Sequence, residues 1–272
     1  YKFYIFLVYR SFINIMQKII KKIIHKLFDK FDYKILKKEE LINFRLDDFK
    51  KSLEITDFTN IYKNENLVSF ISKNFSKSHS QIFQDLLVYY ILKKQKGIYC
   101  EVGALDGKEL SNTLYLEKEH GWRGILCEPN KSYQELIKKN RPNNIIITEP
   151  LFSKEDQVVN FTELEGGRSG IDKSSYSRKS YELKTTTLNK VLKENLNDEN
   201  INYISIDTEG TEYEIIKELD FDKFYPEIIT IEHNYDKKKR EQIYSLLKNK
   251  NYDRYFKSIS RFEDWYIRPL NK

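Results

Sequence analysis

From Ser80 onward the chain alternates between short apolar runs and amphipathic segments, and this alternation restricts its fold more than any other feature. Strand patterns occur at 98–102, 124–128, 144–148, 203–207 and 227–232. Helical patterns occur at 81–95, 132–140, 188–196, 212–219 and 237–249. The alternation predicts an α/β fold, a parallel sheet covered by helices on both faces. Right-handed crossovers bring the carboxyl ends of these strands to one edge, so we expect the ligand site there.

The two ends of the chain differ from this central pattern. A last pair of strand patterns, 252–257 and 263–268, predicts a terminal antiparallel hairpin. The first 96 residues contain neither glycine nor proline, so long helices are expected there. We therefore expect two parts, a basic helical N-terminal extension over residues 1–78 and an α/β domain over residues 79–272.

The net charge of +6 lies in the N-terminal part. Residues 1–80 carry 16 Lys and Arg against 9 Asp and Glu, whereas residues 81–272 carry 31 against 32. The α/β domain is thus close to neutral, which argues against nucleic acid as its partner. Within the extension, residues 16–38 place apolar side chains at helical spacing among eight lysines. This pattern is typical of a basic helix in peripheral contact with an anionic membrane surface, and the alternative is a helix packed on the domain.

Two cysteines, Cys100 and Cys127, lie in predicted buried strands, where inert core thiols are expected. The chain has no Cys-x-x-Cys pair, so neither a disulfide framework nor a zinc site is indicated. The apolar run at 3–16 is shorter than the roughly 20 residues that a membrane span needs. These features favour a cytoplasmic location, peripheral on the inner membrane face if residues 16–38 bind lipid.

Two glycines follow the first predicted strand in the pattern Glu101-x-Gly103-x-x-x-Gly107. Gly103 would allow a tight turn and a close backbone approach to a ligand. The spacing differs from the Gly-x-Gly-x-x-Gly of dinucleotide sites, where a pyrophosphate sits on a helix N-terminus. Glu101 would repel a pyrophosphate at this turn, and it favours a cationic ligand.

The second predicted strand ends at Glu128, where a carboxylate can accept hydrogen bonds from both hydroxyls of a ribose. An acid in this place also occurs in dinucleotide folds. The wider glycine spacing and the lack of a phosphate-binding lysine or arginine favour S-adenosylmethionine over NAD. A nicotinamide-dependent oxidoreductase on a similar sheet is the alternative. Ser132-x-x-Glu135 then predicts a capping box for the next helix.

Several separated motifs resemble the FkbM family of S-adenosylmethionine-dependent methyltransferases. They are SQIFQD at 80–85, EVGALDG at 101–107, SNT at 111–113, GWRGILCEP at 121–129 and IDTEGTE at 206–212. The resemblance covers about residues 79–269. It implies a Rossmann-like, seven-stranded class I methyltransferase sheet and O-methylation of a hydroxyl on a sugar, glycan or secondary-metabolite acceptor.

The resemblance also implies a set of cofactor-binding residues. The set is Gln84, Asp85, Glu101, Gly103, Asp106, Asn112, Glu128, Ser153 and Asp207. Glu101, Gly103 and Asp106 would line the methionine end of the cofactor, and Glu128 would hold the ribose. The loop containing Ser153 would lie near the adenine, while Gln84 and Asp85 would close the site.

Acids and a histidine at the ends of two later strands are the catalytic candidates. Thr211-x-x-Glu214 predicts a second capping box, which leaves Asp207 and Glu209 without a structural explanation. His233 ends the following strand, and its ordinary pKa near 6.5 suits a general base. The alternative for His233 is a hydrogen bond to a backbone carbonyl. These three side chains could instead hold Mg²⁺. A requirement for a divalent cation is therefore an alternative, and no metal ligand is assigned.

Two further features concern the acceptor. No Asn/Asp-Pro-Pro-aromatic tetrad follows the strand at 203–207, and methyltransferases of exocyclic base amines use that tetrad, so a hydroxyl acceptor is favoured. Residues 163–180 hold three of the nine glycines and many serines, which predicts a substrate lid rather than a plain surface insert. The alternative to an enzyme is a non-catalytic, membrane-docked module with the same fold.

Overall fold

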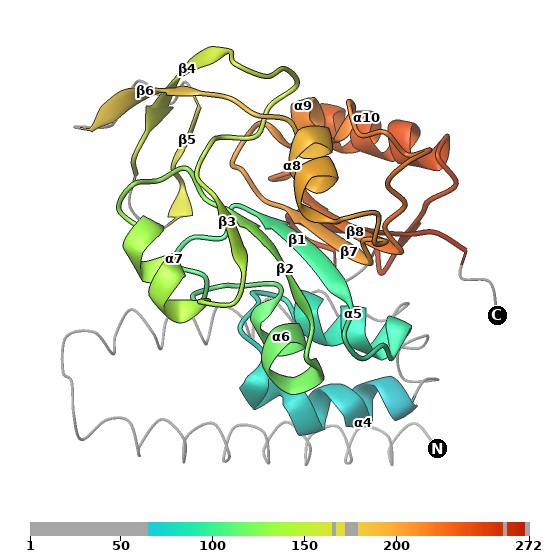
Figure 1. Ribbon diagram of the computed structural model, residues 1–272. Helices are drawn as coiled ribbons and strands as arrows, with labels where there is room; N and C mark the ends of the chain where they lie inside the picture. Colours follow the sequence, from blue (N-terminus) through green and yellow to red (C-terminus); the bar gives the residue numbers. More distant parts are fainter. Residues whose placement is uncertain (1–64, 165–166, 172–178, 258–259, 270–272) are drawn as a thin grey trace. The chain divides into compact units, whose positions relative to one another are not determined.

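The computed structural model describes residues 65–164, 167–171, 179–257 and 260–269 (Figure 1). The chain divides into two units, and all described residues belong to the second, Ser52–Lys272. The predicted amphipathic helix at 16–38 lies outside the described residues, so its membrane contact and the cytoplasmic location stay predictions. Within the described part of the chain, no helix has the length and apolar character needed to cross a bilayer.

Seven strands form one sheet in the order β3-β2-β1-β7-β8-β10-β9. Their bounds are β1 (Ile98–Val102), β2 (Arg123–Cys127), β3 (Ile145–Ile147), β7 (Tyr203–Ile206), β8 (Ile228–Glu232), β9 (Asp253–Tyr255) and β10 (Glu263–Ile267). The first five are parallel to one another, and β10 runs antiparallel between β8 and β9. The predicted α/β class, the seven-stranded sheet and the terminal hairpin are therefore confirmed.

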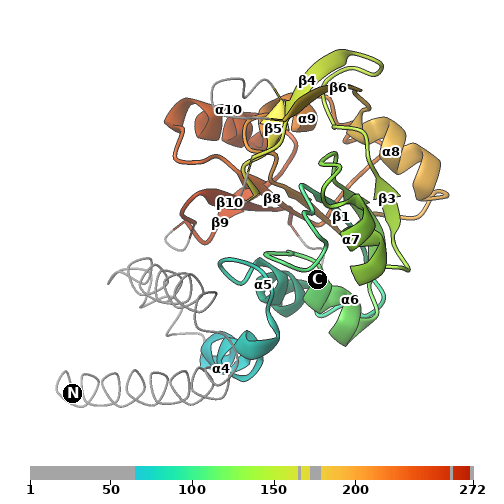
Figure 2. The ribbon, with the colours of Figure 1, turned by 90° about the vertical axis from the view of Figure 1, so that its left-hand side faces the viewer.

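Helices cover both faces of this sheet (Figures 1 and 2). One face packs against α5 (Gln84–Leu92), α6 (Leu114–His120) and α7 (Gln134–Asn140), and the other against α8 (Leu188–Asn195), α9 (Glu212–Ile216) and α10 (Lys237–Lys248). Successive strand residues alternate between the two cores, since Tyr99 joins the α5 side while Cys100 joins the α8 side. Both cysteines are buried and free, as expected.

Helix α6 is absent from the sequence predictions. It has seven residues, and its first three, Leu114, Tyr115 and Leu116, are all buried. A first turn that is buried on all sides shows no helical period, because only an amphipathic segment displays one.

The compact unit begins before the predicted boundary at 78/79. Helix α4 (Glu65–Asn74) and the 3-10 helix η1 (Phe75–Lys77) precede it. Leu67 of α4 packs in one buried cluster with Leu87 of α5 and Trp265 of β10. Burial of Leu67 against the sheet thus ties this part of the expected extension to the domain.

A second, smaller sheet lies between β3 and α8 in the sequence and was not predicted. It consists of β4 (Val158–Thr162), β5 (Gly170–Ile171) and β6 (Ser180–Lys184), in the antiparallel order β5-β4-β6. The predicted lid at 163–180 contains β5 and the start of β6, and its residues 165–166 and 172–178 lie outside the described residues. Strand β5 is too short to give an alternating pattern.

Both predicted capping boxes are wrong. The Ser132 hydroxyl donates a hydrogen bond to Glu163 at 2.8 Å, and α7 begins at Gln134 without a side-chain cap. The Thr211 hydroxyl donates to Thr208 at 2.8 Å, and α9 also lacks a side-chain cap. In each case a neighbouring polar group competes for the hydroxyl, which the local sequence pattern does not reveal.

The turn after β1 leads to a stability prediction. A Cβ on Gly103, whose φ is +88°, would lie 1.7 Å from the carbonyl oxygen of Asp207 on the neighbouring chain segment. We expect Gly103→Ala to lower the free energy of unfolding by at least about 2 kcal/mol, because backbone cannot yield as a flexible side chain does. Denaturant titration of the full chain measures this loss.

Gly210→Ala is the matched control. Gly210 has φ +142°, but nothing lies within 4 Å of its added Cβ. Only backbone strain, on the order of 1 kcal/mol, should then oppose the substitution. Equal losses in the two variants would contradict the steric explanation for Gly103.

Candidate functional site

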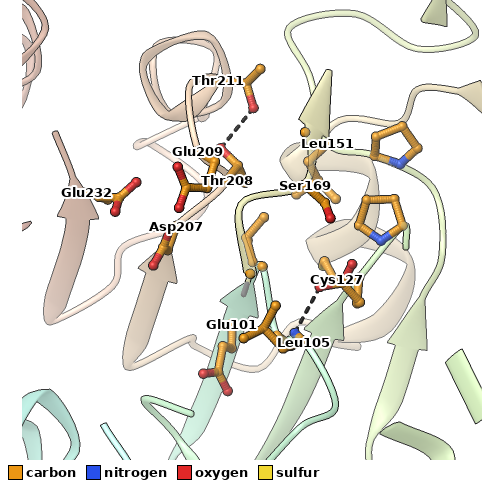
Figure 3. Close-up of a pocket in the computed structure, with 18 of the residues that line it drawn as sticks. Glu101, Leu105, Cys127, Leu151, Ser169, Asp207, Thr208, Glu209, Thr211 and Glu232 are labelled. Atoms are coloured by element: carbon orange, nitrogen blue, oxygen red, sulfur yellow. Dashed lines mark hydrogen bonds between the residues drawn. The ribbon is translucent and has the colours of Figure 1, made fainter. Parts of the chain in front are cut away.

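A pocket opens at the carboxyl ends of β1, β2, β7 and β8 (Figure 3). It lies where the chain order reverses, because β1 is flanked by β2 on one side and by β7 on the other. Such a switch point is where open α/β sheets bind ligands. The pocket contains about 1000 Å³ of empty volume, part of it open to solvent.

Six predicted site residues line this pocket, and five do not. The lining residues are Glu101, Gly103, Asn112, Glu128, Asp207 and Glu209. The others are Gln84, Asp85, Asp106, Ser153 and His233. The predicted set is therefore divided between residues that line the pocket and residues that lie outside it.

The turn that follows β1 is fixed by hydrogen bonds to β2. The Gly103 and Ala104 N–H groups donate to the Cys127 carbonyl at 2.9 and 3.2 Å. Because Gly103 has no Cβ, the backbone carbonyl of Asp207 can lie close to it. The sequence predicted such a close approach by a ligand, but in the structure the segment that follows β7 makes it. The Leu105 N–H donates to Glu128 at 2.9 Å, which joins the turn to the acid at the end of β2.

Glu128 is held in one orientation, with 4% of its surface exposed. Its carboxylate accepts hydrogen bonds from the backbone N–H groups of Leu105 and Asn130, at 2.9 and 2.8 Å. Burial raises the pKa of Glu128 to about 7, although these two hydrogen bonds oppose the shift. A buried, oriented carboxylate of this kind can accept hydrogen bonds from ligand hydroxyls.

Glu101 is also buried, but its carboxylate binds the chain itself. It accepts hydrogen bonds from the Asn112 N–H at 2.6 Å, from the Ser111 hydroxyl at 2.9 Å and from the Thr113 hydroxyl. In Figure 3 this carboxylate points away from Asp207 and Glu209. Glu101 therefore shapes the pocket by holding residues 111–113 against β1.

Arg141, at the end of α7, reinforces the same region and was missed by the sequence analysis. The side chain is fully buried, and its guanidinium donates to Glu117 at 2.6 Å, to the Gly107 carbonyl at 2.9 Å and to the Ser111 hydroxyl at 3.2 Å. It lies 3.9 Å from Glu101. A Cβ on Gly107 would lie 2.7 Å from the Arg141 side chain, so that glycine makes room for the arginine. No sequence pattern distinguishes this arginine from the surface ones.

The predicted general base, His233, lies outside the pocket lining. Its Nδ1 accepts a hydrogen bond from the Tyr235 N–H at 3.1 Å, and its Nε2 lies 3.8 Å from Asp264. Burial lowers the pKa of His233 to about 4, against the opposing effect of the Asp264 charge. Strand residues alternate in direction, and here Glu232 faces the pocket while His233 does not.

Of the other predicted residues outside the lining, Gln84, Asp85 and Asp106 form hydrogen bonds within the protein. Gln84 donates to Glu263 at 2.6 Å. Asp85 accepts hydrogen bonds from the Ser80 hydroxyl at 2.6 Å and from other groups at the start of α5. Asp106 accepts from two N–H groups of its own turn. Ser153 lies two residues beyond Leu151, which does line the pocket.

Three acids meet at one end of the pocket. Asp207, Glu209 and Glu232 each offer an oxygen, and these oxygens lie within 4.8 Å of one another. Figure 3 shows them on the side of the pocket opposite Cys127, Leu151 and Ser169. The Asn234 amide donates to Glu232 at 2.8 Å and to Glu209 at 3.3 Å. We call Asp207, Glu209 and Glu232 the acidic group.

Desolvation and mutual repulsion perturb this acidic group. Desolvation, followed by the charges of Glu263, Glu212 and Glu209, raises the pKa of Asp207 to about 8. The same factors, with Asp207 the largest of the charges, raise the pKa of Glu232 to about 11. Perturbed carboxylates in a pocket are typical of functional sites. Glu232 was missed because His233 was preferred at the same strand end.

Glu212 adjoins the acidic group but has a structural role. One of its oxygens accepts hydrogen bonds from the Thr208 and Gly210 N–H groups, at 3.0 and 2.8 Å. The other accepts from the Lys239 ammonium at 2.8 Å. Its charge is neutralised by Lys239, and it fixes the turn that presents Glu209 with φ +60°.

The opposite wall of the pocket is apolar. Leu151 and Cys127 come from the main sheet region, and Phe161 and Ile171 come from the small sheet. Strand β5 lies within the predicted lid at 163–180, whereas the contribution of β4 was not predicted. A flat aromatic ligand can be buried against such a wall.

Comparison with known proteins gives a family. A family model described as "Methyltransferase FkbM domain" matches residues 101–254, more than half of the chain. No curated protein matches the chain. The match favours the methyltransferase interpretation over the nicotinamide alternative.

Solved structures with a similar arrangement are distant in sequence. A proposed caffeoyl-CoA O-methyltransferase from Staphylococcus aureus has 12% identity and a TM-score of 0.43, covering 78% of this chain and 96% of its own. A precorrin-6y C5,15-methyltransferase from Geobacter metallireducens GS-15 has 13% identity and a TM-score of 0.38, covering 62% and 71%. A methyltransferase from Pyrococcus furiosus has 11% identity and a TM-score of 0.39, covering 70% and 84%. Likeness at this level says nothing about substrates.

The Arg141 network leads to a second stability prediction. We expect Arg141→Met to lower the free energy of unfolding by about 3–5 kcal/mol, because it leaves Glu101 and Glu117 without their buried cation. Arg123→Met is the control, since Arg123 forms an exposed pair with Glu199. Exposed pairs contribute about 0–1 kcal/mol. Similar losses on chemical denaturation would rule out a special role for Arg141.

Proposed function

This chain belongs to the FkbM methyltransferase family, and we propose that it methylates a hydroxyl of a sugar, glycan or secondary-metabolite acceptor. Methyl transfer with S-adenosylmethionine as donor follows from the family. The choice of a hydroxyl acceptor rests on the acidic group at the end of the pocket.

The pocket suits the three chemical parts of the donor. Glu128 offers a buried carboxylate for the two ribose hydroxyls, and the wall that includes Leu151, Phe161 and Ile171 suits an adenine. The acids near Asp207, in their ionised forms, favour a cationic methionine end electrostatically. When bound, S-adenosylmethionine supplies an electrophilic methyl group on a sulfonium. The protein's own task is to align the acceptor and to remove its proton.

The acidic group is the observation that carries the hydroxyl proposal. A neutral hydroxyl must lose its proton as the new bond forms, and Asp207, Glu209 and Glu232 place oxygens within 4.8 Å of one another on the pocket wall. These carboxylates can accept that proton directly or bind a divalent cation that lowers the pKa of the hydroxyl. The segment after β7 reads Asp207-Thr-Glu209-Gly, without the Pro-Pro-aromatic sequence associated with base amines.

Binding of the donor is the first test. We expect calorimetric titration of the full chain to show one S-adenosylmethionine site and no NADH site. Glu128→Ala should raise the dissociation constant at least about tenfold, because it removes a charged acceptor of two hydrogen bonds. Glu149→Ala is the control, since Glu149 lines the same pocket but is exposed. The proposal fails if NADH binds in place of S-adenosylmethionine, or if a folded protein binds neither.

The raised pKa of Glu128 predicts that donor binding depends on pH. Its carboxylate is ionised above about pH 7 and protonated below it. Affinity for S-adenosylmethionine should therefore fall as the pH is lowered, by up to about tenfold between pH 8 and pH 6 if the ionised form binds. Glu128→Gln, which cannot titrate, should bind more weakly and with a clearly smaller slope. An identical slope in both proteins would assign the pH dependence to another group.

A further inference from the structure

We propose that Asp207, Glu209 and Glu232 bind one divalent cation of the Mg²⁺ type, which holds the acceptor hydroxyl beside the methyl donor. This inference rests on the proposed function and adds a metal to the acceptor half of the same pocket. It is carried by the arrangement of carboxylates across three neighbouring strands and by a buried carboxylate oxygen that has no partner.

The sheet aligns three acids side by side. Ile206 of β7 pairs with Ile231 of β8, so the next residues, Asp207 and Glu232, are neighbours at the strand ends. Glu263 of β10 pairs directly with Glu232. Directly opposed residues of an antiparallel pair project to the same face of the sheet. Glu209 approaches from the turn that Glu212 holds, which completes the set of oxygens.

Glu263 provides a second observation that is independent of the cluster itself. Only 1% of its surface is exposed, and its Oε1 has no hydrogen-bond partner. Its other oxygen accepts a hydrogen bond from Gln84 at 2.6 Å. An unpaired, buried carboxylate oxygen is unfavourable by several kcal/mol unless a positive charge or a donor lies nearby. Its register opposite Glu232 places it next to the acidic group, and Glu263 itself is not among the residues that line the pocket.

The charge balance supports a bound cation. Within the described ranges, no lysine or arginine forms an ion pair with Asp207, Glu232 or Glu263. Lys239 is paired with Glu212, which adjoins the acidic group, at 2.8 Å. A divalent cation would offset the repulsion between Asp207 and Glu232, which form no ion pair with a lysine or arginine of the described ranges.

The donor atoms indicate the kind of cation. All three are carboxylate oxygens, which suit Mg²⁺, Mn²⁺ or Ca²⁺ rather than zinc. Three oxygens on one side leave coordination positions free for water and for an acceptor hydroxyl. The hydroxyl oxygen would then bond to the methyl carbon while the carbon–sulfur bond breaks. The electron pair of that bond goes to sulfur, and the hydroxyl proton leaves to solvent.

Direct measurement of Mn²⁺ binding tests the site without any turnover. We expect electron paramagnetic resonance titration of the full chain, free of S-adenosylmethionine, to show one Mn²⁺ per chain that Mg²⁺ displaces. Asp207→Asn and Glu232→Gln should each weaken binding at least about tenfold, because each removes one of three charged ligands. Glu263→Gln should weaken it less. Glu149→Gln, a pocket acid outside the acidic group, should leave it unchanged.

The outcome separates this inference from the proposed function. Circular dichroism of each variant shows whether it is folded, and S-adenosylmethionine binding is measured in parallel with EDTA. If the donor binds but Mn²⁺ does not, the metal site is wrong and the methyltransferase proposal stands. If Glu149→Gln weakens Mn²⁺ binding as much as Glu232→Gln, binding is non-specific and the assignment also fails. If neither ligand binds to folded protein, both ideas fall.

Discussion

A carboxylate buried at the end of a strand is unfavourable unless its charge is satisfied, and the whole site of this protein depends on how that condition is met. Glu128 is satisfied by two backbone N–H groups and Glu212 by Lys239. Glu101 is satisfied by the groups at 111–113, with Arg141 nearby. These acids are fixed parts of the fold. Glu232 accepts a hydrogen bond from the Asn234 amide, but within the described residues neither Glu232 nor Asp207 forms an ion pair with a lysine or arginine, so these two acids remain able to act on a ligand.

This difference divides the pocket into two halves. On the β1–β2 side, two backbone N–H groups hold the Glu128 carboxylate in one orientation, which suits a ligand that is the same in every reaction cycle. On the β7–β8 side, the carboxyl groups of the acidic group are crowded, and burial and mutual repulsion raise the pKa values of Asp207 and Glu232. A site of that kind can exchange protons or cations with a ligand. Phe161 and Ile171 of the small sheet form part of the apolar wall. This sheet, which is inserted between β3 and α8, therefore contributes directly to the pocket.

The sheet was predictable because its strands are uniformly buried and separated by helices with clear periods. Each expected strand bound agrees with the structure to within one or two residues, as for 98–102 and Ile98–Val102. Helix α6 was missed because its first turn is uniformly buried and shows no amphipathic period, and strand β5 was missed because two residues are too few to alternate. The site was partly predictable, since acids at adjacent strand ends must lie near one another. The choice between Glu232 and His233 was not, because a one-residue difference at a strand end reverses the side-chain direction.

The sequence by itself determined the α/β class, the edge of the sheet that carries the site and the acids Glu128, Asp207 and Glu209 at that edge. Local periodicity and the handedness of crossovers suffice for these conclusions. Only the tertiary structure decided that Gly103 makes room for a backbone carbonyl, that Arg141 holds the turn after β1, and that Glu232 joins the acidic group. Each of these depends on distances between segments far apart in the chain, which no local pattern encodes.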